Sequence, residues 1–236
     1  MKRIFTLFLA GVSICAAAQN SPYISKVYDF LPAPGQFVNE LPEYMDGDSH
    51  EAILAKVEEQ ICGDKNPGMI SLGAFGGYVV FGFDHPVANV EGAYDFKIYA
   101  NAFMAAGSSA GGSCEPGIVM VSVDANGNGL ADDEWYELAG SDYGKETTIK
   151  NYSITYYKPD ADKTPTADGM ITDSTYIRWT SSEGDEGYVM KNSFHNQSYW
   201  PEWYEGETME FVGTKLADNA TDTSGNGSNF VLTRLD

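Results

Sequence analysis

Basic residues are scarce in this sequence of 236 residues, which has 14 Lys and Arg against 34 Asp and Glu and a formal charge of −20. So acidic a chain repels a phosphate backbone, which argues against nucleic acid as a partner. Hydrophobic residues are not scarce: they make up 43% of the chain, and aromatic residues 13%. The chain can therefore bury a core, which excludes wholesale disorder, and its length suits one large β domain.

Long apolar runs are absent after the start of the chain, so no later segment is expected to span a membrane. At the start, two basic residues precede an apolar run from Ile4 to Ala17, which is short for a bilayer span. Small side chains then lead up to Ala18, as a signal peptidase requires. We predict that residues 1–18 are a secretory signal and that residues 19–236 form one exported domain, in the periplasm or at the outer cell surface.

Cysteines are also few. Cys15 lies in the predicted signal and follows Ile14 rather than a small residue, which argues against a lipid anchor. Cys62 and Cys114 remain after cleavage, and an oxidising compartment permits a disulfide between them. Such a bond would close a loop of about fifty residues and stabilise the fold by roughly 3–4 kcal/mol. Two buried free thiols are the alternative. No CxxC or HExxH motif indicates a zinc site.

Helical periodicity occurs once. Asp48 or Ser49 can cap a helix that ends at Gly63, and its apolar residues recur on one face: Ile53, Leu54, Val57 and Ile61. The rest of the chain favours strands, because short runs rich in branched and aromatic residues alternate with Gly, Asn and Asp loops. These runs are Gly77–Phe83, Tyr94–Ala100, Gly117–Val123, Glu134–Leu138, Thr148–Tyr157, Thr175–Trp179, Met209–Val212 and Phe230–Leu235. We predict an all-β, jelly-roll-like sandwich with one short helix covering an end.

One loop has the spacing of a calcium site. Between two predicted strands, oxygen-bearing side chains occupy its first, third and fifth positions, and Gly129 occupies the sixth, as in an EF-hand loop. The twelfth position departs from that pattern, because Trp135 stands where a bidentate Glu is expected. A metal-free hairpin turn is the alternative. We predict structural Ca²⁺ bound by Asp124, Asn126, Asn128, the carbonyl of Leu130, Asp132, and Asp133 or Glu134.

Several strings spread over most of the predicted mature chain resemble a family of secreted cell-surface proteins of Bacteroidetes-type bacteria. They are Pro32–Phe37, Ser71–Gly77, Gly82–Pro86, Asp95–Phe96, Asn101–Phe103, Glu115–Val119, Asp124–Ser141, Gly187–Val189 and His195–Pro201. Such proteins sometimes accompany PKD-like modules or outer-membrane uptake systems. The resemblance implies a β-sandwich with a binding role at the cell envelope, and it implies no catalytic residue. Because some proteins of this kind are encoded near corrinoid uptake genes, the resemblance also makes a vitamin B12-type ligand conceivable.

An aromatic run near the C-terminus is the predicted ligand surface. Aromatic rings in a Pro-containing segment can form a platform for a sugar ring or a corrin edge, or they can plug one end of the sandwich. The candidate ligand-binding residues are His195, Tyr199, Trp200, Trp203 and Tyr204.

Catalytic patterns are weak. Gly107–Gly111 matches the GxSxG pattern. A hydrolase nucleophile elbow requires a helix after this pattern, and no helix is expected here. Asp84 could fix the tautomer of His85, or the pair could stabilise a turn. Paired carboxylates would suit a glycoside hydrolase, and the candidates are Glu183, Asp185, Glu186, Glu202 and Glu205. We predict a non-catalytic, calcium-stabilised binding protein for a small molecule or glycan. The alternatives are a corrinoid-capture protein, an adhesion module and a glycoside hydrolase.

Overall fold

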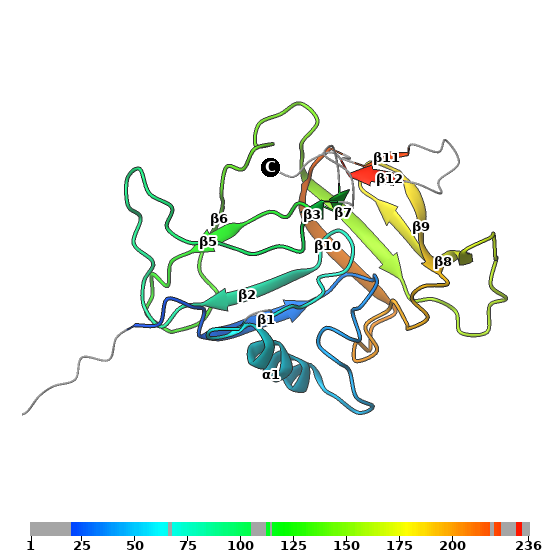
Figure 1. Cartoon of the computed structure of the whole chain (residues 1–236), viewed down its shortest axis with the longest axis horizontal. Coiled ribbons are helices and arrows are strands. Elements are labelled where there is room, and N and C mark those ends of the chain that lie inside the picture. The colour runs from blue at the N-terminus through cyan, green and yellow to red at the C-terminus, as the bar shows by residue number, and fades with distance from the viewer. Residues whose placement is uncertain are drawn as a thin grey trace, which may run out of the picture.

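The protein is built from antiparallel β-sheets and one short helix (Figure 1). The structure, a computed structural model, describes residues 20–65, 68–104, 112–113, 115–217, 220–222 and 230–232. The elements in chain order are β1 (Lys26–Leu31), α1 (His50–Ile61), β2 (Tyr78–Gly82), β3 (Phe103–Met104), β4 (Gly112–Ser113), β5 (Met120–Ser122), β6 (Trp135–Glu137), β7 (Ile149–Tyr157), β8 (Ile171–Ser181), β9 (Glu186–Asn192), β10 (Thr208–Lys215), β11 (Ala220–Asp222) and β12 (Phe230–Leu232).

The strands form four antiparallel sheets within these residues. The largest has the order β10-β7-β8-β9, and a smaller four-stranded sheet has the order β11-β12-β4-β3. Two ribbons, β1-β2 and β5-β6, complete the set, with α1 packed along β1 (Figure 1). The predicted all-β class with one short helix is confirmed. In the described ranges, no helix is both long and apolar enough to cross a bilayer.

Local signals set both ends of α1. The Ser49 hydroxyl accepts a hydrogen bond from the backbone N–H of Ala52 at 3.3 Å, as an N-cap does. Gly63 follows the last turn with φ of +76°, a conformation that glycine adopts without a steric penalty. Ile53 and Val57, four residues apart, are buried against β1. The predicted helix and its caps are confirmed.

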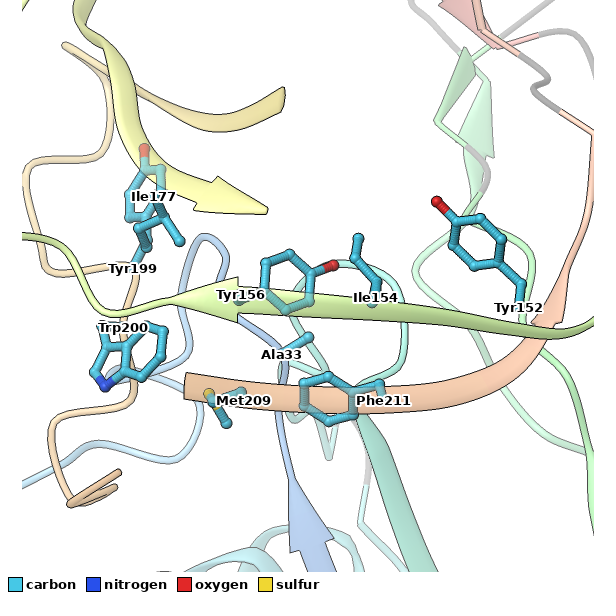
Figure 2. Packing of buried hydrophobic residues seen from close by; sticks show 9 residues of the cluster. All are labelled: Ala33, Tyr152, Ile154, Tyr156, Ile177, Tyr199, Trp200, Met209 and Phe211. Atoms are coloured by element: carbon cyan, nitrogen blue, oxygen red, sulfur yellow. The ribbon is translucent and has the colours of Figure 1, made fainter. Parts of the chain in front are cut away.

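The main core lies on one face of the β10-β7-β8-β9 sheet. In β7, alternate residues Tyr152, Ile154 and Tyr156 are buried, as period-two patterning requires. Figure 2 shows them packed with side chains from β8, β10 and two loops, and the whole cluster is Ala33, Tyr152, Ile154, Tyr156, Ile177, Tyr199, Trp200, Met209 and Phe211. The core therefore joins the sheet to the chain that follows β1 and to the aromatic run.

Glycines in the Ser71–Gly77 loop let that loop approach the core closely. Gly73 has a φ of +70°, and a Cβ added there would lie 1.7 Å from the carbonyl oxygen of Ala33. A Cβ on Gly76 would lie 2.2 Å from the Cβ of Phe211. Any larger residue at either position would push the loop away from the sheet, which gives the glycine-rich string a structural role.

One predicted strand is wrong, and several strands were not predicted. Tyr94–Ala100 forms no strand, and Tyr94 and Tyr99 have exposed fractions of 101% and 84%. The run has strand-like residues, but no described segment pairs with it, and a strand exists only through pairing. The unpredicted strands are β1, β3, β4, β9 and β11.

Candidate calcium loop and aromatic cleft

The candidate calcium loop joins the two strands of a hairpin, as the sequence predicts. β5 and β6 pair antiparallel, with Ser122 opposite Trp135. Gly127 and Gly129 both have positive φ, at +72° and +73°, and these values let the loop turn back twice within a few residues. The hairpin therefore holds residues 124–134 in a compact exposed loop.

Asp124 organises the first half of the loop. Its carboxylate accepts hydrogen bonds from the backbone N–H groups of Asn128 at 3.1 Å and Gly129 at 2.9 Å. The side-chain oxygen of Asn126 accepts from the N–H of Asn128 at 2.9 Å, and that of Asn128 accepts from Leu130 at 2.8 Å. The oxygens at the first, third and fifth positions are thus all fixed by the loop backbone. Each keeps lone pairs beyond the one it uses in these bonds.

The second half of the loop brings two more carboxylates to the same place. The Asn128 side-chain amide donates to both oxygens of Asp132, at 3.2 and 3.1 Å. The Asn126 amide lies 3.4 Å from both oxygens of Asp133. Glu134 points elsewhere, because its carboxylate accepts a 2.6 Å hydrogen bond from the hydroxyl of Tyr136. Of the two residues proposed to complete the shell, the structure brings only Asp133 to the others.

Carboxylates alone do not make a metal site here. Across the described ranges, no three His, Cys, Asp or Glu side chains lie close enough to hold one ion. A cation in this loop would also need the amide oxygens of Asn126 and Asn128 and the carbonyl of Leu130. Calcium accepts such mixed oxygen ligands, usually six to eight of them.

The aromatic run is split between core and surface. Tyr199 and Trp200 have exposed fractions of 0% and 3%, so they plug the main core and cannot form an exposed platform. His195 is half-buried and packs edge to face with Phe37, with ring centroids 4.6 Å apart. Trp203 and Tyr204 line a cleft. The platform prediction is therefore wrong for Tyr199 and Trp200, because both rings are buried in the hydrophobic core.

Asn39 fixes the path of this run. Its side-chain amide donates to the carbonyls of Ser198 at 3.0 Å and Trp200 at 2.8 Å. Its side-chain oxygen accepts from the N–H of Glu202 at 2.9 Å. One residue from the loop after β1 thus pairs three backbone groups of the run, and this holds the following residues at the edge of the β1-β2 ribbon.

A cleft of about 700 Å³ lies between this run, β1 and the start of α1. Trp203 stacks on His50, with ring centroids 5.0 Å apart and planes 4° from parallel. Carboxylates come from three separate segments of the chain and share the cleft with aromatic rings. The lining residues are Asp29, Leu31, Tyr44, Asp46, Gly47, Asp48, Ser49, His50, Tyr78, Glu202, Trp203, Tyr204 and Glu205.

Two of the cleft carboxylates have protein partners. Asp29 accepts from the Tyr78 hydroxyl at 2.7 Å, and burial together with this bond raises the pKa of Tyr78 well above its usual value. His50 Nε2 lies 3.1 Å from the Phe30 carbonyl and 3.4 Å from Asp29, so Nε2 carries the proton, since a carbonyl only accepts. Asp48 pairs with Lys56, and that hydrogen bond lowers the pKa of Asp48.

The other sequence candidates are scattered. Asp84 holds His85 Nδ1 at 2.6 Å and accepts from the N–H of Ser21 at 3.1 Å, which is a turn-stabilising contact. Of the five candidate carboxylates, only Glu202 and Glu205 line the cleft. Within the described residues Cys62 has no disulfide partner, and burial raises the pKa of its thiol. Its predicted partner Cys114 lies outside the described residues, so the disulfide stays a prediction. The whole GxSxG string, Gly107–Gly111, also lies outside them.

No local sequence signal could have found the cleft as a whole. Its members Asp29, His50 and Tyr78 meet Trp203 only through the β1-β2 pairing and the start of α1. Comparison with protein-family models and with curated proteins found no match to this chain.

Proposed function

We propose that the protein is an exported, non-catalytic binding protein of the cell envelope, which takes a small molecule or glycan in the cleft beside Trp203 and Tyr204. The observation that carries this proposal is the cleft itself, where aromatic rings and hydrogen-bonding carboxylates share one concave surface. Binding sites for small ligands combine these features. The basic and apolar start of the sequence supports export.

Ligand binding should depend on Trp203. In a thermal-shift screen of glycans and small molecules, cobalamin included, a binder is expected to raise the melting temperature of the wild-type protein. The shift is expected to disappear in Trp203→Ala, since that change removes the largest aromatic ring of the cleft lining. Trp135→Ala is the matched control, because Trp135 lies on the β5-β6 hairpin. A ligand whose shift survives Trp203→Ala binds elsewhere and contradicts the proposed site.

Structural calcium is the second part of the proposal, and it is supported by the convergence of Asp124, Asn126, Asn128, Asp132 and Asp133 on one short loop. At millimolar calcium, a weak extracellular site stabilises the fold by about 1–3 kcal/mol. In a protein of this size, each kcal/mol corresponds to roughly 2–4 °C in melting temperature.

Removing calcium with EGTA should therefore lower the melting temperature, and Asp132→Asn should abolish most of that calcium-dependent difference. Glu134→Gln should keep it, because Glu134 contacts Tyr136 and not the loop. The quantity to compare is the difference in melting temperature between calcium and EGTA for each variant. A substitution in the loop can alter the melting temperature itself, with or without calcium. A sample shown by elemental analysis to hold calcium, yet indifferent to EGTA, would refute the site.

One observation favours glycoside hydrolysis as a second candidate. Glu202 and Glu205 lie on one loop of the cleft, whereas Asp29 comes from β1 and Asp46 from the segment before α1. Carboxylates from separate segments around one cleft are what glycoside cleavage uses. Release of reducing ends from a bound glycan, lost in Glu202→Gln or Asp29→Asn, would establish this alternative over simple binding.

A further inference from the structure

The cleft carries negative charge that the protein leaves unpaired. Nothing in the described ranges donates a hydrogen bond to the carboxylates of Asp46, Glu202 or Glu205, or forms an ion pair with them. No Lys or Arg belongs to the lining, and the nearby Lys56 is engaged by Asp48. The His50 proton on Nε2 is directed to the Phe30 carbonyl and Asp29. The walls thus repel an anion and favour a cation.

The aromatic residues of the same cleft also favour a cation. Tyr44, Tyr78, Trp203 and Tyr204 all line it, and ring faces attract ammonium groups, with Trp the most favourable. One face of Trp203 is already occupied by His50, whose ring is stacked on it. This stacking fixes the orientation of the indole and leaves its opposite face for packing or for a ligand.

A separate observation concerns hydrogen bonding. The indole nitrogen of Trp203 is buried and has no acceptor in the described part of the chain. A buried N–H without an acceptor is unfavourable, and such groups are rare in folded proteins. Because the nitrogen is shielded from solvent, this N–H is not accessible from the cleft, and the ring itself is what Trp203 offers to a ligand. Charge and the aromatic lining therefore call for a ligand that has both an ammonium group and a ring that can pack against Trp203 and Tyr204.

We infer that the cleft selects an amine that carries a ring, with an amino sugar as the class that fits both requirements. The ammonium group would lie among Asp46, Glu202 and Glu205, and the sugar ring would lie against Trp203 and Tyr204. This inference rests on the proposed binding function and specifies its ligand class. Anionic ligands such as uronates are excluded from the cleft by the same carboxylates.

The test uses three tetrasaccharides of different charge: the glucosamine tetramer, which is cationic, its N-acetylated neutral form, and tetragalacturonate, which is anionic. Binding is measured by calorimetry on the full calcium-loaded chain, at a slightly acidic pH where the amines are charged. We expect the glucosamine tetramer to bind at least about tenfold more tightly than the neutral form, and tetragalacturonate not to bind. The preference should weaken as salt is raised.

Matched charge variants separate local from overall electrostatics. The triple change Asp46→Asn, Glu202→Gln and Glu205→Gln should lower the affinity for the glucosamine tetramer by about tenfold or more. A control with the same charge change outside the cleft, Glu183→Gln, Asp185→Asn and Glu210→Gln, should stay within about twofold. Equal losses in the two variants would show that net charge alone attracts the amine, and would overturn the inference.

The contact with Trp203 has its own readout. The chain has four tryptophans, so its indole N–H signals can be resolved and assigned by NMR. The Trp203 signal is the one that is missing from the spectrum of Trp203→Phe. The Trp203 signal is expected to move on binding and the Trp135 signal to stay. If the neutral tetramer binds as tightly as the glucosamine tetramer, the charge inference fails while the binding function stands. If none of the three binds, the inference fails, and if the wider glycan and small-molecule screen is also empty, the proposed function fails with it.

Discussion

Trp200→Ala is expected to lower the free energy of unfolding by about 3–5 kcal/mol, the range for removing a large buried aromatic ring. Trp200 is 3% exposed and belongs to the main core, beside Met209 of β10 and Tyr199 (Figure 2). Its ring also meets Tyr204 edge to face at 6.1 Å. Truncation therefore leaves a cavity between the sheet and the aromatic run, and the close-packed surroundings can fill it only in part.

The measurement is urea unfolding at fixed calcium, with Trp200→Phe as the control that keeps an aromatic ring and should lose much less stability. Trp203→Ala is the informative comparison, since Trp203 is half-buried at the cleft. We expect the Trp200 change to affect chiefly stability and the Trp203 change chiefly ligand binding. An unchanged unfolding midpoint in Trp200→Ala, together with lost binding, would mean that Trp200 contacts the ligand, as the sequence predicted, and is not part of the core.

These two neighbouring tryptophans show what sequence can and cannot predict here. The sequence marks the run from Tyr199 to Tyr204 as important, because such a density of aromatic rings needs either a core or a ligand. It does not say which ring goes where. That division depends on Asn39, which lies more than a hundred and fifty residues away and pairs the carbonyls of Ser198 and Trp200 with its side chain.

Features that depend on near neighbours were predictable. α1 follows from the cap at Ser49 and the spacing of Ile53 and Val57, and burial on β7 follows from strict alternation of Tyr152 and Tyr156 with polar residues. The loop at Asp124 belongs to this group too, because its hydrogen bonds join residues two to eight apart.

Features that depend on distant pairing were not predictable. β1 has a charged Asp29 in its middle and a bulge between Val27 and Asp29, so its pattern does not read as a strand. Tyr94–Ala100 reads as a strand and has no partner among the described strands. The cleft illustrates the consequence, since Asp29 becomes a lining residue only once β1 pairs with β2 and brings it to Tyr78.

Asp173→Ala is expected to lower the free energy of unfolding by about 1–3 kcal/mol, the range for leaving hydrogen-bonding groups without their acceptor. Asp173 lies in β8 with an exposed fraction of 6%, and its carboxylate accepts from Lys163 Nζ at 2.9 and 3.1 Å. It also accepts from the backbone N–H groups of Thr175 at 3.0 Å and Thr166 at 3.2 Å. Alanine would leave the Lys163 ammonium and two N–H groups without this acceptor.

The same carboxylate should make stability depend on pH. Burial acts to raise the pKa of Asp173, but the hydrogen bonds from Lys163, Thr175 and Thr166 outweigh it and lower the pKa. A carboxyl whose pKa is lower in the folded than in the unfolded state stabilises the fold fully above its unfolded pKa of about 3.9. That contribution is lost as the pH falls through the lower folded value.

Asp173→Asn isolates this effect, because the amide keeps the shape and one acceptor oxygen but cannot ionise. Urea unfolding in calcium-free buffer should show a large stability difference between wild type and Asp173→Asn at neutral pH. The difference should shrink as the pH falls below about 4, where the carboxyl of the unfolded wild-type chain takes up a proton, and it should be gone once the folded carboxyl is protonated at its lower pKa. Calcium is left out so that metal binding at the proposed loop site cannot contribute to the pH dependence. A difference that stays constant down to the acid limit would mean that Asp173 acts on Lys163 and Thr166 by shape and hydrogen bonding alone, and that its charge contributes nothing to stability.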